Sequence, residues 1–461
     1  MTANSTQKLS PQQVRGLLMF IFAALGGILY GYDLGIISGA LLFISKDIPM
    51  SVDEESFLVA AVFGGGSIAT LVSGFLADKF GRKKMIIAGA VVFIVSVFII
   101  YYSNTFVTLL SGRLIQGIGV GIITMVVPLY LSESMPTSLR GRGVTLFQLL
   151  LTLGIFMSSI VGLYYTPTGN WRDMFLSALV PGVIMAVGCI FLSESPRWLA
   201  LKGDFEKTLK VLKKTRTDTE ADEELTHMKN SIEKEKSQVK TSEHKLWQRR
   251  FILPVAVVFS IAILQQLTGI NILLQLSSVI LSQAGLRSNI LAMMGTNAIT
   301  GLNVVMTVVA LFLVDKLERR TLMSFGTGGI VLAMAYSGAV FYFVNPGTEK
   351  GYMLLCGILA FIFFYAVGPG ALVWTVLSEL LPSKVRSGGL AIALFLNSMA
   401  SSAFAGVFLK LTKHLGFAGV FWLCSGFTFA YFLLCFFMIQ KTKGKSLEDI
   451  EEEFAAAKIV H

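Results

Sequence analysis

The sequence predicts an all-α membrane protein in which twelve transmembrane helices form two six-helix halves, with short helices between the halves. Three observations carry this prediction. The 461-residue chain is 54% hydrophobic and only 14% charged, with a mean hydropathy of +0.71. About twelve apolar runs are long enough to cross a bilayer. The loop motifs that follow the runs of the first half recur in the second half.

The composition excludes a soluble globular protein. Such a protein carries about a quarter of its residues as charged side chains, and this chain has too few to cover a surface exposed to water. We therefore expect the lipid bilayer as its main surroundings. The net charge of +10 does not indicate nucleic acid as a partner, because the basic residues lie in short loops between apolar runs. The four cysteines lie inside apolar runs and do not have the spacing of a metal site.

The spans follow from length and hydrophobicity. A helix needs about 20 mostly apolar residues to cross about 30 Å of hydrocarbon. Charged or turn-forming residues separate the successive runs. We expect spans at 16–44, 56–76, 84–103, 106–131, 143–166, 173–193, 251–283, 290–314, 321–344, 351–380, 386–412 and 417–439.

The distribution of Lys and Arg predicts the orientation. The loops after the second, fourth, eighth and tenth spans carry clusters of basic residues, whereas the other loops carry few. Positive residues favour the cytoplasmic side. We therefore expect these loops and both termini in the cytoplasm, and the compact loops indicate the inner membrane of a bacterium.

A charged segment rich in Lys and Glu separates the two halves. Within it, 204–214 and 219–236 are typical of short helices on the cytoplasmic face, and a run of charges of this kind is usually a solvated surface. The chain thus divides into four parts: an N-terminal half (1–193), a helical linker (194–250), a C-terminal half (251–440) and a cytoplasmic tail (441–461).

Two loop motifs repeat six spans apart. Residues 131–141 are similar to 377–387, and residues 77–83 are similar to 314–320. Each matching pair falls on the same side of the membrane, which indicates a parallel repeat of two halves. Transporters with this layout bind their substrate between the halves near the bilayer midplane and rock one half against the other.

The repeated loops combine acidic residues with Arg at neighbouring cytoplasmic helix ends. Ion pairs between them would hold the inner side shut while the outer side is open, which is a gating role. Anchoring of helix ends in the headgroup region is the alternative interpretation. The candidate gating residues are Asp78, Arg82, Glu133, Arg140, Glu194, Arg197, Asp315, Arg319, Glu379 and Arg386.

Several motifs occur in a characteristic order from about Gly26 to about Glu451. They are Tyr30-Gly31-Tyr32-Asp33, Gly74 through Lys83, Gly112-Arg113, Pro128 through Glu133, Pro136, Arg140-Gly141, Gln148, Glu194-Ser195-Pro196-Arg197-Trp198-Leu199, Gln265-Gln266-Leu267-Thr268-Gly269-Ile270-Asn271, Gly368-Pro369-Gly370 and Lys443-Gly444-Lys445-Ser446-Leu447-Glu448. In these motifs the chain resembles the sugar porter family of the major facilitator superfamily. The resemblance implies a monomeric secondary transporter, not an enzyme, that imports a hexose or pentose with a proton by alternating access. No cofactor is implied besides the proton as coupling ion.

Asp33 and Arg113 are the candidate proton-coupling residues. A charge inside a span costs several kcal/mol and marks a functional site. Asp33 lies eighteen residues after Arg15, about 27 Å along a helix, and Arg113 lies about 10 Å into a span that starts outside. The two residues can therefore meet. An Arg keeps a carboxylate ionised, whereas separation in an apolar site favours protonation. Within the resembled family, proton-coupled symporters carry Asp here and facilitative carriers carry Asn. A fixed structural ion pair is the alternative.

A set of amides is the candidate sugar site. Side-chain amides donate and accept hydrogen bonds without a net charge, as sugar hydroxyls require. Gln266 and Asn271 are five residues apart, near enough to share a broad helix face. For any one amide, a hydrogen bond between helices is the simpler interpretation. By resemblance, the residues that contact the sugar are Gln148, Gln265, Gln266, Asn271, Asn303, Trp374 and Asn397.

Glycines in the first and fourth spans predict close helix approach, and the Gly368-Pro369-Gly370 run predicts a bend in the tenth span. The chain also departs from the family pattern. Two tyrosines usually follow Gly-Ile-Asn, but Gln275 and Leu276 stand there. A polyol or inositol therefore stays open as the substrate, and an uncoupled sugar facilitator stays open as the mechanism.

Overall fold

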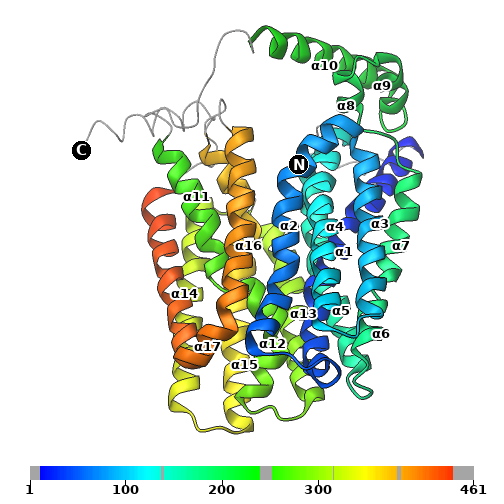
Figure 1. Ribbon diagram of the computed structural model, residues 1–461. Helices are drawn as coiled ribbons and strands as arrows, with labels where there is room; N and C mark the ends of the chain where they lie inside the picture. The colour runs from blue at the N-terminus through cyan, green and yellow to red at the C-terminus, as the bar shows by residue number, and fades with distance from the viewer. Residues whose placement is uncertain (1–10, 136–139, 239–251, 315, 382–385, 440–461) are drawn as a thin grey trace.

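The computed structural model describes residues 11–135, 140–238, 252–314, 316–381 and 386–439. Within these ranges the chain is helical and contains no strand. Figure 1 shows two bundles of long helices side by side, with a group of short helices at one end. We call the end with the short helices the linker end, and the opposite end the far end.

The N-terminal half contains five long helices and one span that is broken in two. Ser51 caps the second helix through its hydroxyl, and the Glu54 carboxylate returns a hydrogen bond to the Ser51 backbone nitrogen at 2.8 Å. Thr105 and Thr108 form a similar reciprocal cap on the fourth helix. The elements are α1 (Pro11–Asp47), α2 (Val52–Phe80), α3 (Arg82–Tyr101), α4 (Phe106–Ser134), α5 (Arg140–Tyr165), α6 (Trp171–Leu176) and α7 (Leu179–Ile190).

Three short helices form the linker: α8 (Pro196–Leu201), α9 (Phe205–Leu212) and α10 (Asp218–Gln238). The last two agree with the helices expected at 204–214 and 219–236. Asp204 caps α9, and its hydrogen bond with the Lys207 ammonium lowers the pKa of its carboxyl below the ordinary value. The linker thus forms short amphipathic helices at one end of the bundle (Figure 1).

The C-terminal half repeats the architecture with two broken spans and one very long helix. Two spans lie in the last element, because Gly416 has φ 68° and ψ 167° and interrupts the helix there. The elements are α11 (Ile252–Leu267), α12 (Ile270–Ala284), α13 (Asn289–Val314), α14 (Arg319–Phe343), α15 (Thr348–Val367), α16 (Pro369–Leu380) and α17 (Arg386–Met438).

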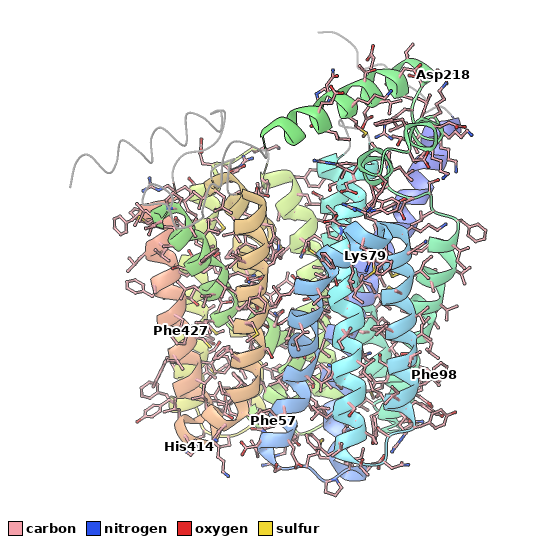
Figure 2. The ribbon with its side chains drawn as sticks, turned by 45° about the horizontal axis from the view of Figure 1, so that its top comes forward. Phe57, Lys79, Phe98, Asp218, His414 and Phe427 are labelled. Atoms are coloured by element: carbon pink, nitrogen blue, oxygen red, sulfur yellow. The ribbon has the colours of Figure 1, made fainter. Side chains whose placement is uncertain are left out.

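Eleven helical stretches of the described chain are long and apolar enough to span a membrane. The last of them, Gly388–Met438, has 51 residues, more than twice the length of one span, and Gly416 divides it. The prediction of twelve spans is therefore confirmed. Apolar side chains such as those of Phe57 and Phe98 are exposed on the outside of the bundle, where lipid would cover them (Figure 2).

Two breaks shape the C-terminal half. The bend expected at Gly368 is confirmed, because α15 ends at Val367 and α16 begins at Pro369. The span expected over 251–283 is present and is also broken, since α11 ends at Leu267 and α12 begins at Ile270. Gly269 adopts φ 89° at the break, a left-handed conformation that glycine tolerates without strain.

The glycines of α1 and α4 permit direct contact between helix backbones, as predicted. A Cβ added at Gly31 would lie 1.9 Å from the carbonyl oxygen of Leu151, and one at Gly117 would lie 2.2 Å from that of Val62. Neither position accommodates a side chain at this helix separation.

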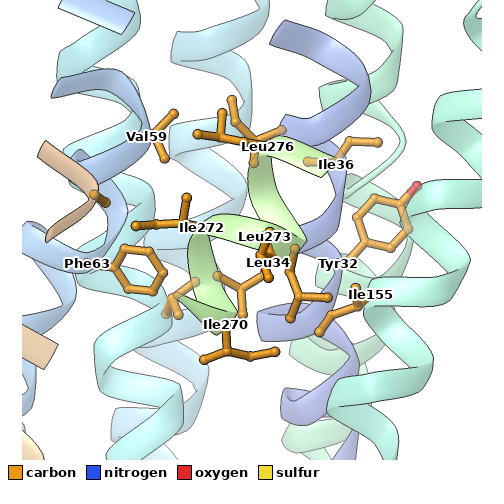
Figure 3. Packing of buried hydrophobic residues seen from close by; sticks show 14 of the residues in the cluster. Tyr32, Leu34, Ile36, Val59, Phe63, Ile155, Ile270, Ile272, Leu273 and Leu276 are labelled. Atoms are coloured by element: carbon orange, nitrogen blue, oxygen red, sulfur yellow. The ribbon is translucent and has the colours of Figure 1, made fainter. Parts of the chain in front are cut away.

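Contacts between the halves run through α1 with α12, α5 with α13, and α2 with α17. Apolar residues of α12, including Ile272 and Leu276, share one core cluster with Ile36 and Val59 of the other half (Figure 3). Hydrogen bonds also join the halves. Ser38 is bonded to Ser278 at 3.0 Å, Ser159 to Thr300 at 2.8 Å, and Ser402 to the Ala60 carbonyl at 3.3 Å.

These inter-half hydrogen bonds lie near the far end. Ser38 precedes the end of α1 by nine residues, Ser159 precedes the end of α5 by six, and Ala60 follows the start of α2 by eight. At 1.5 Å per residue each lies within about 14 Å of that end. The two halves are therefore held together toward the far end in this conformation.

Candidate functional site

Asp33 and Arg113 form a fully buried ion pair between α1 and α4. Both side chains are essentially inaccessible, at 0% and 1% exposure, and Arg113 Nη1 lies 2.6 Å from Asp33 Oδ1. The same nitrogen donates to Gln116 Oε1 at 2.8 Å. The Arg113 guanidinium also lies 5.5 Å from the centroid of the Phe175 ring, within cation–π range. The predicted meeting of the two charges is thus present.

The hydrogen bonding of this pair is incomplete. Four buried atoms have no hydrogen-bond partner among the described residues: Asp33 Oδ2, Arg113 Nε and Nη2, and Gln116 Nε2. Buried polar groups are normally satisfied, and an ionised group left unpaired is the most unfavourable case. The site thus has unused donors and an unused acceptor around one carboxylate.

Four of the predicted sugar-site amides form one hydrogen-bonded network. Gln266 Nε2 donates to Gln265 Oε1 at 2.8 Å and to Asn397 Oδ1 at 2.9 Å. Asn271 Nδ2 donates to Gln266 Oε1 at 2.7 Å, and Asn397 Nδ2 donates to Gln265 Oε1 at 2.7 Å. These amides come from α11, α12 and α17. Side chains far apart in the sequence therefore converge on one polar cluster inside the C-terminal half.

The break between α11 and α12 brings Gln266 and Asn271 together. The expectation that they share one helix face was wrong, because they lie on different helices. The turn at Thr268 and Gly269 reorients α12 so that the Asn271 amide reaches back to Gln266. Proximity thus arises from an interrupted helix rather than from the helical repeat.

The other three predicted sugar-site residues lie outside this network. Gln148 lies half-buried in α5, Asn303 is buried in α13, and Trp374 in α16 is 37% exposed. The hydrogen bonds found among the described residues do not connect them to the four amides. They belong to helices of both halves, so the candidate residues surround the region between the halves instead of forming one closed cluster.

Three residues of the site were missed by the sequence analysis. The Tyr365 hydroxyl lies 2.5 Å from Gln265 Nε2, and Ser401 Oγ accepts from Asn271 Nδ2 at 3.0 Å. Gln116 is the third, as the second acceptor of Arg113. Gln116 and Ser401 follow Arg113 and Asn397 by three and four residues, so helical spacing could have identified both. Tyr365 depends on packing between α11 and α15 and carries no comparable signal.

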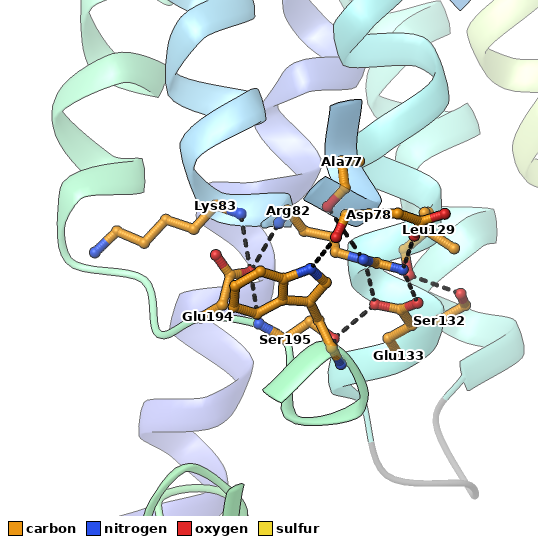
Figure 4. Close-up of polar contacts among 10 residues, drawn as sticks. Ala77, Asp78, Arg82, Lys83, Leu129, Ser132, Glu133, Glu194 and Ser195 are labelled. Carbon is orange, nitrogen blue, oxygen red and sulfur yellow. Dashed lines mark hydrogen bonds and ion pairs between the residues drawn. The ribbon is translucent and has the colours of Figure 1, made fainter. Parts of the chain in front are cut away.

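A second polar cluster lies at the linker end and fastens the N-terminal half (Figure 4). Arg82 donates from Nε and Nη2 to the two carboxylate oxygens of Glu133, at 2.8 and 2.9 Å, and Nη2 lies 3.0 Å from Asp78. Ser195 Oγ donates to Glu133 Oε2 at 2.6 Å. The two hydrogen bonds between Arg82 and Glu133 are charge-assisted and bidentate, which makes them stronger than hydrogen bonds between neutral groups.

Glu194 caps the first turn of α3. Its Oε1 accepts from the backbone nitrogens of Arg82 and Lys83 at 2.9 and 3.1 Å, and from that of Ser195 at 2.9 Å. A carboxylate is favoured at this position because helix N-termini carry unpaired N–H groups and a partial positive charge. The segment that enters the linker is thereby tied to α3.

One ion pair of the equivalent cluster in the C-terminal half lies within the described residues. Arg319 Nε lies 3.4 Å from Glu379 Oε1, and both side chains are 21% exposed. Arg197 is exposed at the start of α8 and has an interaction of its own. Asp315 and the side chains of Arg140 and Arg386 lie outside the described residues. The ion pairs Arg82–Glu133 and Arg319–Glu379 each join helices of the same half.

Comparison with known proteins gives concordant matches. A family model described as sugar (and other) transporter matches residues 19–454. The chain is 37% identical over 441 residues to the glucose transporter GlcP of Staphylococcus epidermidis, covering 95% of this chain and 96% of that protein. It is 32% identical over 433 residues to the galactose-proton symporter of Escherichia coli strain K12, covering 93% and 92%.

Solved structures agree with the sequence matches. The inward open conformation of the xylose transporter XylE from E. coli aligns with a TM-score of 0.81 at 25% identity. The alignment covers 95% of this chain and 99% of that structure.

Proposed function

The chain belongs to the sugar porter family of the major facilitator superfamily, and on that premise we propose that it imports a monosaccharide together with a proton by alternating access. It is an integral membrane transporter and not an enzyme. The observation that carries the proton coupling is the fully buried Asp33–Arg113 pair with its unsatisfied carboxylate oxygen. Asp33 carries the proton, and Arg113 stabilises the ionised carboxylate.

The amide network supplies the sugar chemistry. Each sugar hydroxyl donates and accepts, and a carboxamide offers both functions without a net charge. The four amides bind one another, so a sugar that binds to them exchanges existing hydrogen bonds for new ones. Gln148, Asn303 and Trp374 complete the site from the neighbouring helices, with Trp374 providing an apolar face for the sugar ring.

The conformation supports a direction for the access pathway. The described inter-half hydrogen bonds lie near the far end, which is the side we assign to the exterior. The linker end is then cytoplasmic, as the basic loops predict. Both termini lie on that side of a bacterial inner membrane, and the protein acts as a monomer.

The acidic and Arg residues of the linker end hold each half rigid during the rocking movement. Arg82, Glu133 and Glu194 form this support in the N-terminal half, and Arg319 with Glu379 forms it in the C-terminal half. In this role they stabilise the two six-helix halves at the cytoplasmic surface.

Reconstituted liposomes test the proposal. The purified protein is placed in weakly buffered vesicles, and external pH is recorded after addition of D-glucose, D-galactose, D-xylose, L-arabinose or myo-inositol. We expect alkalinisation with at least one sugar, because a proton enters with each sugar. Asp33→Asn should abolish that pH change while exchange of the labelled sugar persists, because the variant keeps the amide site but has no ionisable carboxyl.

Asp47→Asn is the matched control, since Asp47 forms an exposed ion pair with Arg172 near the far end. This variant should keep the pH change. Labelled sugar entry without any pH change in the wild type would instead establish an uncoupled facilitator. Entry of myo-inositol alone would assign a polyol as the substrate, and entry of no probe would refute the proposed substrate class.

A further inference from the structure

Gln116 and Gln275 are fully buried glutamines whose side chains keep unbonded atoms among the described residues. Gln275 has no partner there for either side-chain polar atom, whereas Gln116 is bonded through one of them. Gln116 Oε1 accepts from Arg113 Nη1 at 2.8 Å, and Gln116 Nε2 is the unbonded atom. A buried amide costs free energy unless hydrogen bonds replace those it makes with water. The side-chain hydrogen bond that the structure shows for Gln116 is therefore with the proton-coupling pair.

Arg113 Nη1 is shared between two acceptors of different chemistry. It donates to Asp33 Oδ1 at 2.6 Å and to Gln116 Oε1 at 2.8 Å. The Asp33 carboxylate loses its charge when it takes a proton, whereas the amide stays neutral in both states. The guanidinium stays charged, because arginine does not lose its proton in proteins. Gln116 is thus the acceptor that Arg113 retains after Asp33 has been protonated.

The helices around Asp33 offer Arg113 no second carboxylate among the described residues. The helices packed against α1 are α4, α5, α6, α7 and α12, and the last two contain no acidic or basic residue. Apart from Asp33 and Arg113, the acidic and basic residues of these helices and of α1 lie near helix ends: Arg15, Lys46, Asp47, Glu133, Arg140, Arg142, Arg172 and Asp173. The other titratable groups on these helices are neutral near pH 7: Tyr30, Tyr32, Tyr130, Tyr164, Tyr165 and Cys189.

Gln116 Oε1 also acts on Asp33 itself. The amide oxygen carries a partial negative charge and contacts the same nitrogen as Asp33 Oδ1, so it repels the carboxylate while Asp33 is ionised. A neighbouring negative group favours the protonated form of a carboxyl. The hydrogen bond to Arg113 and the repulsion of ionised Asp33 therefore act in the same direction, toward proton uptake.

We propose that Gln116 is a positioning residue for proton coupling, which holds the Arg113 guanidinium while Asp33 is protonated and so raises the pH at which the protein loads its proton. This inference rests on the proposed function, in which Asp33 carries the proton. An apolar side chain at position 116 would leave Arg113 without an acceptor in the protonated state, and a buried charge without a partner is unfavourable. Proton loading would then require a lower pH.

The pH dependence of uptake into proteoliposomes tests this role. The probe is whichever labelled sugar of the liposome panel the wild type exchanges fastest, and its initial uptake rate is measured against external pH at a fixed membrane potential. We expect Gln116→Leu to move the midpoint of this profile to lower pH by about one unit, a tenfold change in proton concentration. Gln116→Met keeps the length of the side chain without the amide and should shift the midpoint in the same direction, also if the Leu variant does not fold.

Thr124→Val is the matched control on the same helix. The Thr124 hydroxyl donates to the Val120 carbonyl of α4 at 2.8 Å, so its removal should leave the midpoint in place. If the Gln116 variants lower the rate at every pH without moving the midpoint, or move it to higher pH, Gln116 serves packing alone and the proposal is overturned.

The Asp33→Asn background shows which group the amide acts on. This variant loads no proton, so adding Gln116→Leu should leave the pH dependence of labelled sugar exchange unchanged. A shift in that background would overturn the proposal, because Gln116 would then act on another titrating group. Wild-type uptake that neither depends on external pH nor alkalinises the medium refutes the proposed coupling itself, which is a separate result from a wild type that couples and Gln116 variants that do not shift.

Discussion

One guanidinium nitrogen, Nη1 of Arg113, donates both to Asp33 at 2.6 Å and to Gln116 at 2.8 Å. The remaining nitrogens of that side chain have no partner. A buried pair of this kind contributes little net stability when intact, but removal of one partner leaves an uncompensated charge. Proton coupling and folding stability therefore depend on the same contact, between Arg113 Nη1 and Asp33 Oδ1.

Arg113→Met should lower the free energy of unfolding by about 3–5 kcal/mol, because Asp33 is then buried without its counter-ion. The double variant Asp33→Asn with Arg113→Met should recover most of that loss, since the neutral amide does not need a cation. Thermal unfolding of the purified proteins in detergent measures the stability of the single and the double variant. A double variant as unstable as Arg113→Met would show that Arg113 acts through its packing against Phe175 and not through charge.

The arrangement of the helices explains why Asp33 meets Arg113 and why Asn271 meets Gln266. Helices of the N-terminal half approach closely at glycines, so α1 lies directly against α5 and α2 against α4. The C-terminal half instead uses breaks, at Gly269 and Gly368, to redirect α12 and α16. Close packing positions Asp33 opposite Arg113, and an interrupted helix positions Asn271 opposite Gln266. Close helix packing thus forms the ion-pair site, and a helix break forms the amide network.

Gly31→Ala tests the close approach of α1 and α5. The added Cβ would lie 1.9 Å from the Leu151 carbonyl oxygen, so the helices must separate. We expect a loss of at least about 1–3 kcal/mol of stability, as in other overpacked cores, with lower sugar exchange. Gly426→Ala is the control, because nothing lies within 4 Å of its Cβ position and Ala favours helix. Equal melting temperatures for the two variants would contradict the packing argument.

The whole molecule is in a conformation in which hydrogen bonds join its halves toward the far end. Ser38 and Ser278 make one of these contacts, and the Ser278 hydroxyl also donates to the Ser38 carbonyl at 2.5 Å. Hydrogen bonds between neutral hydroxyls contribute only about 0.5–1.5 kcal/mol each. Each of these hydrogen bonds therefore adds little to the apolar packing that also joins the halves.

Linking Ser38 to Ser278 covalently should stop that cycle. In a variant without native cysteines, Ser38→Cys with Ser278→Cys should form a disulfide under oxidation and abolish exchange of the labelled sugar. Reduction should restore it. Each single cysteine variant is the control and should respond to neither treatment. Exchange that continues after complete cross-linking would show that the halves need not separate at this point for transport.

The sequence determined the architecture by itself. Hydropathy, the basic loops and the repeated motifs are properties of consecutive residues, and they predict twelve spans in two halves without knowledge of any contact. The pairing of Asp33 with Arg113 was also within reach, because depth along a helix follows from residue counting.

Only the tertiary structure decided how polar side chains are paired. The network of Gln265, Gln266, Asn271 and Asn397 depends on the break at Gly269 and on the rotation of α17 about its axis. The lack of partners for Gln275 depends on every helix around it. Membrane insertion depends on the hydrophobicity of consecutive residues, which can be read from the sequence. A hydrogen bond between two helices also depends on their relative rotation and separation, and the sequence of either helix alone does not specify these.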